Sequence, residues 1–347
     1  VPWWISLMGA LSCFVVMFLI DAITTIIALS IVVVIFIVLK KRKVNATWGD
    51  LRRGIWLALT RRSLLQMEQY PEHPKNWRPN MMVLTRIPQG RMDLVRFAHW
   101  FGQQSGVVTI RHVMVGPFEK MARRRQLAGN NLNRFIAENN LMAFGAVDVL
   151  EEQSTDLRLV LMSQGYGTFR GNAVLIDWSE RAESKPGEFE DLVFGVLQAD
   201  KTLMLLREDN DRGFGSCNRI DVWAKGREEA SIMLVLADLL RRNRQWRDTD
   251  ILFFYLVDKK ENINAAEDEA TRLVEAGRVR CEITVMVEDG AIDKTMSKTS
   301  SDASLLLCGF DPAVCGDEDP FEKMNQRLEH LPTTLLVKAA SGMDLLA

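Results

Sequence analysis

The chain opens with an almost uninterrupted apolar stretch. Residues 3–39 contain one charged side chain, Asp21, and a basic run, Lys40-Lys41-Arg42-Lys43, follows. A helix needs about 20 apolar residues to cross a bilayer, so the stretch predicts two short membrane-spanning helices over residues 1–43, with a turn at Asp21. Basic residues after a span mark the cytoplasmic side. We therefore expect a multi-pass protein of the cell membrane that contacts lipid, with the rest of the chain in the cytoplasm.

Residues 44–77 form a connecting segment with helical periodicity. Thr47 and Asp50 have the spacing of a capping box, and Pro71 ends the pattern. The apolar positions recur at helical spacing and are Trp48, Leu51, Ile55 and Leu59. Such a helix packs on a partner subunit, on its own domain or on anionic headgroups. We take these four residues as a candidate dimer and coupling helix.

From residue 78 onward, short β-branched runs alternate with helical patterns. This alternation predicts βαβ units, mainly parallel strands and helices on both faces. A polar stretch at 208–218 interrupts the pattern, which then restarts. We therefore expect two related α/β halves, 78–215 and 216–347.

Composition narrows the class of partner. Lys and Arg number 43 against 45 Asp and Glu, so the chain has no basic excess for binding nucleic acid. Its five cysteines contain no C-x-x-C pair, which favours reduced thiols over a disulfide framework.

Motifs for catalysis are missing. The four histidines fall outside any zinc-ligand spacing, and the sequence has neither a phosphate-loop motif nor a nucleophile-elbow motif. The glycine-rich piece Gly165–Gly171 follows a helical pattern and precedes a strand, which is the reverse of a phosphate cradle. We expect a helix cap and tight turn there, no enzyme activity, no metal and no required cofactor. A nucleotide site at the carboxyl ends of the strands stays open, because ligands of α/β sheets bind there.

Several short motifs occur in a characteristic order along the chain. They are Trp4–Ile20, Thr47-Trp48-Gly49, Asn76-Trp77-Arg78-Pro79, Gly165 with Gly167, Asn172 and Trp178, Ile220-Asp221-Val222-Trp223, and Gln245-Trp246-Arg247-Asp248. In this order they resemble the C-terminal third of cation-chloride cotransporters, the sodium-potassium-chloride and potassium-chloride symporters of the amino acid–polyamine–organocation superfamily. A Lys-Lys pair of the family's glycine motif is absent, and the short loops resemble a prokaryotic relative.

This resemblance implies a fold, a partner and a role. The fold is a transmembrane hairpin followed by a cytosolic α/β domain with two universal-stress-protein-like halves. The domain is regulatory and homodimeric, and the helix after the last span lies near its partner, which suits Trp48–Leu59. Sodium, potassium and chloride bind to earlier spans outside this chain, so no ion-binding residue is expected here.

We therefore expect the final two spans and the cytosolic regulatory domain of an ion-coupled cation-chloride symporter. Two alternatives are the tail of an amino acid permease-like transporter and a free-standing two-span sensor with an α/β ligand-binding domain. A membrane-anchored enzyme is disfavoured by the missing motifs.

Overall fold

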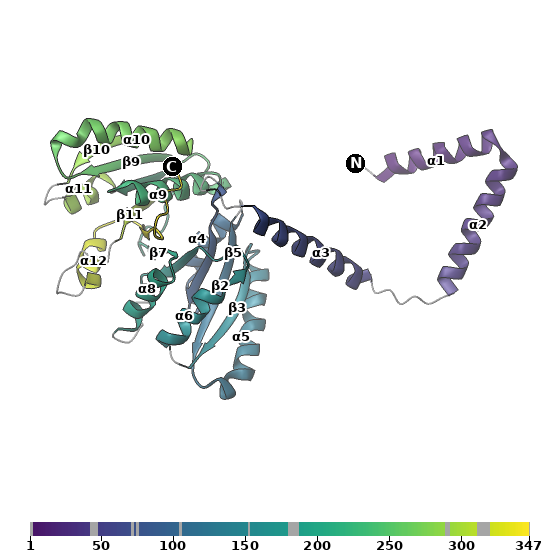
Figure 1. The fold of residues 1–347 in the computed structure, drawn as a ribbon, viewed down its shortest axis with the longest axis horizontal. Coiled ribbons are helices and arrows are strands. Elements are labelled where there is room, and N and C mark those ends of the chain that lie inside the picture. The colour runs from purple at the N-terminus through teal and green to yellow at the C-terminus, as the bar shows by residue number, and fades with distance from the viewer. Residues whose placement is uncertain are drawn as a thin grey trace. The chain divides into compact units, whose positions relative to one another are not determined.

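The computed structural model describes residues 3–41, 48–70, 73, 76–103, 106–151, 153–179, 187–288, 292–310 and 320–346. The chain divides into two compact units, Val1–Gln66 and Met67–Ala347. The first unit is helical and the second carries all the strands described (Figure 1). Each unit is described by itself below.

The first unit contains α1 (Trp3–Ile20), α2 (Ala22–Lys41) and most of α3 (Trp48–Gln69). The turn predicted at Asp21 is confirmed. The Asp21 carboxylate accepts hydrogen bonds from the backbone N–H groups of Ile23, at 3.0 Å, and Thr24, at 3.3 Å. Thr25 donates to the carbonyl oxygen of Met17 at 2.9 Å. Asp21 therefore ends one helix and caps the next.

The prediction of a transmembrane hairpin over residues 1–43 is wrong. Of the helices in the described part of the chain, none is both long enough and apolar enough to cross a membrane. The two predicted spans were short: α1 has 18 residues, and α2 has 20 but closes with Lys40 and Lys41, whereas a span takes about 20 consecutive apolar residues. The multi-pass membrane location, which depended on this hairpin, is wrong with it.

The second unit is built on one ten-stranded sheet of order β10-β9-β8-β11-β12-β7-β6-β1-β2-β3 (Figure 1). The strands are β1 (Asn80–Thr85), β2 (Val107–Val115), β3 (Phe144–Leu150), β6 (Ala173–Asp177), β7 (Thr202–Arg207), β8 (Arg219–Ala224), β9 (Asp250–Val257), β10 (Glu282–Val287), β11 (Leu305–Gly309) and β12 (Thr334–Lys338). The helices of this unit are α4 (Met92–Gly102), α5 (Phe118–Glu138), α6 (Gln153–Ser163), α8 (Glu188–Gln198), α9 (Arg227–Arg241), α10 (Ile263–Gly277), α11 (Ile292–Thr299) and α12 (Pro320–Leu328).

The sheet consists of two five-stranded sets with the same topology. In the first set the chain runs β1, β2, β3 toward one edge and then places β6 and β7 on the other side of β1. In the second set β8, β9 and β10 run outward, and β11 and β12 lie on the other side of β8. The sets join where β7 pairs with β12 in antiparallel register, from Thr334 opposite Arg207 to Lys338 opposite Leu203.

Two hydrophobic cores cover the two faces of this sheet. Alternate strand residues point to opposite faces, so Met81 and Val83 of β1 join one core, and Met82 and Leu84 join the other. The first core contains residues of α4, α5, α9 and α10. The second contains residues of α6, α8, α11 and α12. The unit is therefore a three-layer α/β/α structure.

The predicted α/β region with mainly parallel strands is confirmed, but its strands form one continuous sheet. The boundary between 78–215 and 216–347 stays a prediction, because residues 67–347 cluster as one compact unit. The stretch at Gly165–Gly171 contains a short antiparallel hairpin, β4 (Gly165–Tyr166) with β5 (Phe169–Arg170). Gly165 and Gly167 have φ angles of 119° and 58°, which favour glycine.

Candidate functional site

A crevice lies at the carboxyl ends of strands in the first set. The chain leaves β1 toward α4 on one face and leaves β6 toward α8 on the other. β1 and β6 are neighbours, so this is the topological switch point at which α/β sheets bind ligands. A cavity of about 510 Å³ lies here, and the charged residues that line it are Arg91, Asp93, Asp177, Arg207 and Glu208.

The backbone places these groups directly after strands. Asp177 is the last residue of β6, and Glu208 follows the last residue of β7. Arg91 precedes α4, and its Nε lies 3.7 Å from an Asp177 carboxylate oxygen. Asp177 also accepts a 2.8 Å hydrogen bond from the backbone N–H of Ser179. The sequence left a site at the carboxyl ends of the strands open without predicting its residues, although carboxylates at strand ends were a usable signal.

Among the residues that line this crevice, Glu208 has a strongly raised pKa. Burial, and after it the neighbouring charges of Asp93 and Asp177, raise the pKa of Glu208 to about 7. A hydrogen bond between Glu208 and Asp93 acts in the same direction, whereas Arg96 lowers the pKa. Three carboxylates against two arginines disfavour a polyphosphate in this cavity.

The corresponding edge of the second set contains paired charges. Lys225 follows β8, and its Nζ lies 2.7 Å from Asp258, which follows β9, and 2.5 Å from Glu288, which follows β10. Lys338 ends β12 and lies 3.1 Å from Glu229. These partly exposed pairs contribute little stability. Because their lysines face carboxylates, they do not form a ready phosphate site.

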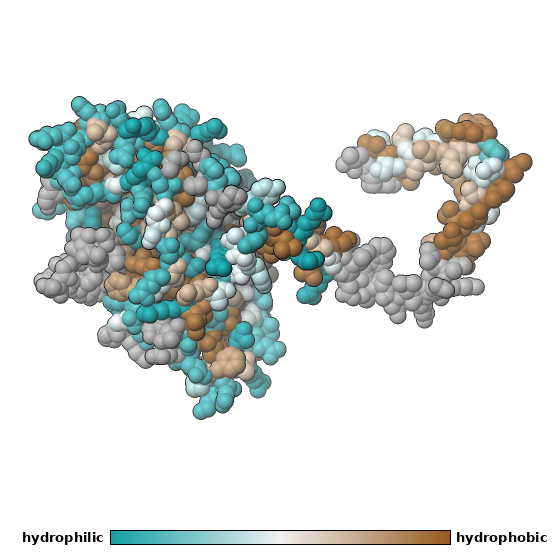
Figure 2. All heavy atoms as spheres, viewed as in Figure 1, coloured by the Kyte–Doolittle hydropathy of each residue, from teal (hydrophilic) through white to brown (hydrophobic). Residues whose placement is uncertain are grey.

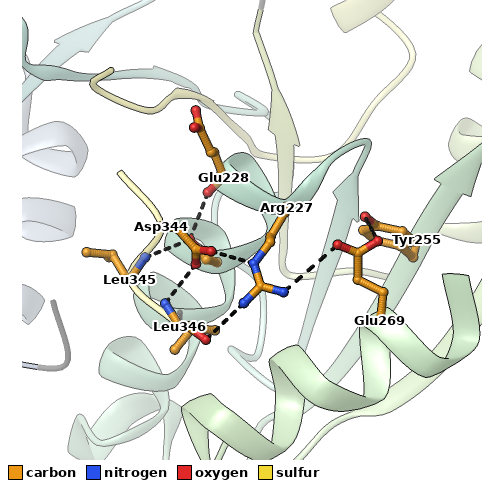
Figure 3. A network of polar contacts seen from close by, with 8 residues as sticks. Arg227, Glu228, Tyr255, Glu269, Asp344, Leu345 and Leu346 are labelled. Carbon is orange, nitrogen blue, oxygen red and sulfur yellow. Dashed lines mark hydrogen bonds and ion pairs between the residues drawn. The ribbon is translucent and has the colours of Figure 1, made fainter. Parts of the chain in front are cut away.

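Arg227, at the start of α9, holds the C-terminal segment in place (Figure 3). Its guanidinium donates to the Asp344 carboxylate and, at 3.3 Å, to the carbonyl oxygen of Leu346. The backbone N–H of Leu345 donates to Ser231 at 3.2 Å. Leu345 and Leu346 are both buried in the first core. This network is a structural clamp, because its groups are engaged with one another.

The segment with the candidate dimer residues is helical, as α3, and its role in dimerisation and coupling stays a prediction. The side chains of Trp48 and Leu51 lie outside the described residues. Ile55 is 53% exposed and Leu59 is 49% exposed, and the neighbouring Trp56 and Leu57 are exposed as well. Figure 2 shows hydrophobic and hydrophilic residues side by side on this helix. Within its own unit, α3 therefore presents apolar side chains that nothing described covers.

The histidines and cysteines form no reactive centre in the part of the chain that the structure describes. Burial lowers the pKa of His99 and of His112, and His99 accepts a 3.0 Å hydrogen bond from the backbone N–H of Met142. Burial raises the pKa of Cys281 and Cys308 to about 11. No group of three or more metal-ligating side chains occurs among the described residues.

Comparison with known proteins supports the fold. No protein-family model matches the chain. One similar solved structure is the cytoplasmic domain of a prokaryotic cation chloride cotransporter, at 16% sequence identity and a TM-score of 0.56. The alignment covers 78% of this chain and 99% of that domain. Another is a universal stress protein from Archaeoglobus fulgidus DSM 4304, at 11% identity and a TM-score of 0.48, covering 76% of this chain and 98% of that one.

The first likeness shows that this chain has the fold of such a cytoplasmic domain. It agrees in part with the family resemblance of the sequence motifs. At 16% identity it concerns the fold and not the activity.

Proposed function

We propose that this chain is a regulatory, self-associating domain of a cation-chloride symporter. The observation that carries the proposal is the fold match, which extends over 99% of the cytoplasmic domain of a prokaryotic cation chloride cotransporter. The order of the sequence motifs is a separate line of evidence, and it indicates the same family. Sodium, potassium and chloride would bind to transport spans outside this chain.

The exposed apolar side chains of α3 support self-association. Large apolar surfaces on a protein mark sites of interaction. Ile55 and Leu59 are four residues apart and therefore lie on the same side of the helix. A second α3 would cover these side chains in a symmetric pair. This arrangement supports the proposed homodimer.

Regulation would act through a difference in the affinity of dimerisation between two states of the transporter. A domain that dimerises more favourably in one state of the transporter shifts the population toward that state. No bond has to be broken for this, and no cofactor is required. The three carboxylates of the switch-point crevice also disfavour a nucleotide phosphate as the regulator.

Sedimentation velocity of the full chain tests the self-association. We expect a concentration-dependent dimer that Ile55→Glu with Leu59→Glu converts to a monomer. The matched control is Leu127→Glu on α5, because Leu127 is equally exposed, at 55%, and lies on another helix. A chain that is monomeric at every concentration, or an equal effect of the control, would contradict the proposal.

A further inference from the structure

Another cavity lies where α4 of the first strand set meets a segment of the second. Its volume is about 420 Å³. α4 lines it with Arg96, His99 and Gln103, whose spacing of three and four residues places them on one side of the helix. The second set contributes residues 243–245, which follow α9. The cavity therefore bridges the two strand sets within one compact unit.

Hydrogen bonds hold this segment of the second set against α4. The Asn243 side chain is 1% exposed, and its amide donates to Oε1 of Gln103 at 2.5 Å. The Trp100 indole N–H donates to the side chain of Gln245. Arg244 lies between these two anchored residues and is therefore held beside the cavity that it lines.

The two charged side chains that line this cavity are both cations. They are Arg96 and Arg244, and no carboxylate occurs among the described residues of the lining. Arg96 lies 3.1 Å from Asp93, but both side chains are exposed, so the pair contributes little. Arg244 is exposed and has no ion pair in the part of the chain that the structure describes. The switch-point crevice, in contrast, has three carboxylates against two arginines.

His99 and Gln103 leave one donor of this cavity without an acceptor among the described residues. Nδ1 of His99 accepts from the backbone N–H of Met142 at 3.0 Å, so the neutral ring carries its proton on Nε2. Nε2 lies 2.8 Å from the amide nitrogen of Gln103, whose amide oxygen already accepts from Asn243. Gln103 thus has a donor on each side and one oxygen to offer. An acceptor from outside the chain is needed here.

We propose that this cavity binds a small oxyanion, a molecule with a phosphate or carboxylate group, through Arg96 and Arg244. Guanidinium groups present paired N–H donors that match the oxygens of both groups. The volume of the cavity lies in the range of small-molecule sites. An oxyanion also supplies the acceptor that His99 and Gln103 lack. The site does not depend on the proposed role in transport, because all of its residues belong to one unit.

Such a ligand would join the two strand sets. Arg96 belongs to α4 of the first set, and Arg244 belongs to the segment after α9 of the second. A ligand that binds the folded unit and not the unfolded chain stabilises the unit as its concentration rises. The cavity would therefore convert the concentration of an oxyanion into a firmer contact between the sets.

Isothermal titration calorimetry of the full chain at pH 7 in Tris buffer tests the site with two probes, inorganic phosphate and succinate. We expect saturable binding of at least one probe, with a Kd of about 1 mM or lower. Binding of phosphate alone would identify the ligand group as phosphate, and binding of succinate alone would identify it as carboxylate. Arg244→Gln and Arg96→Gln should each weaken binding about tenfold or more, because each removes charged donors.

The matched control is Arg123→Gln, since Arg123 is exposed on α5 and does not line the cavity. It should bind like the native chain. The absence of saturable binding of both probes to the native chain would overturn the proposal. Binding that Arg244→Gln and Arg96→Gln leave unchanged, or that the control weakens equally, would overturn it as well.

Gln103→Glu provides a second test that depends on the surplus donor. Its carboxylate would accept from both His99 and Asn243, in the place of the ligand's oxygen. We expect this variant to have a higher Tm than the native chain without ligand and to lose the binding of both probes. A variant that binds them like the native chain would contradict the proposed position of the oxyanion.

Discussion

Leu205 of β7 and Leu336 of β12 face each other at the centre of the antiparallel pair that joins the two strand sets. Both side chains are fully buried, at 0% exposure. Every other neighbouring pair described in the ten-stranded sheet is parallel. The β7–β12 pair, which contains these two residues, is therefore where the first five-stranded set joins the second.

Shortening Leu336 should destabilise the second unit as a whole. Leu336→Ala removes buried contacts and leaves a cavity, at a cost of about 2–5 kcal/mol in the free energy of unfolding. Leu159→Ala is the control, because Leu159 is 62% exposed. Urea unfolding measures both. If the junction joins the sets into one cooperative unit, Leu336→Ala lowers a single transition, whereas an unfolding step of the second set alone would contradict that view.

Removing the partner of a buried carboxylate should cost more at high pH. Asp221 is fully buried, and Arg219 donates two hydrogen bonds of 2.8 Å to it. Burial already raises the pKa of Asp221. Arg219→Met leaves this charge without its cation, which costs about 3–5 kcal/mol at neutral pH.

The pH dependence of this variant has a definite sign. Without Arg219, the pKa of Asp221 rises further above its unfolded value, so stability is lost as the pH rises above that value. Arg219→Met should therefore be least stable relative to the native chain at pH 8 and recover toward pH 5. Thermal unfolding at both values checks this, and a deficit that is constant with pH would refute the explanation.

The clamp on the C-terminal segment should depend on Arg227. Arg227→Met removes the donors to Asp344 and Leu346, which as a partly exposed pair are worth about 0.2–1 kcal/mol. We expect residues 344–346 to become accessible to carboxypeptidase. Lys260→Met, at an exposed position in the short helix Lys260–Asn262, should leave digestion unchanged. Equal digestion of both variants would show that the buried leucines alone hold the segment.

The described cysteines should differ strongly in their reactivity. Cys13 is exposed, whereas Cys308 is buried and the pKa of its thiol is raised to about 11. Thiolates are the reactive form. Iodoacetamide at pH 8, followed by peptide mapping, should modify Cys13 first and Cys308 only after unfolding. Early modification of Cys308 in the folded chain would contradict its burial.

The sequence predicted the strands well and their partners poorly. Buried parallel strands are continuous apolar runs, so the alternation from residue 78 onward predicted that strands such as β2 and β7 exist. Such a run does not say which strand it pairs with, so the β7–β12 junction was not predicted. The stretch Ile292–Thr299 is mostly polar and carries little helical pattern in its sequence, and the buried side chain of Met296 anchors it as α11.

The site was less visible than the fold for a physical reason. Glu208 stands in a polar stretch where a carboxylate is normally solvated, and its raised pKa arises first from burial in the folded unit and then from Asp93 and Asp177, which are distant in sequence. The apolar positions of α3 were visible through their periodicity. The transmembrane prediction rested on the length of two short apolar runs, and among the described residues no helix is long and apolar enough to cross a membrane.

The most direct test of the central claim is a domain exchange in a prokaryotic cation chloride cotransporter. Its cytoplasmic domain is replaced by residues 48–347 of this chain, and chloride-dependent rubidium uptake is measured at equal surface amounts. We predict that the exchanged protein transports more than the protein without the domain, and that Ile55→Glu with Leu59→Glu abolishes this gain. Uptake that is the same with the domain, without it and with the variant would contradict a regulatory function.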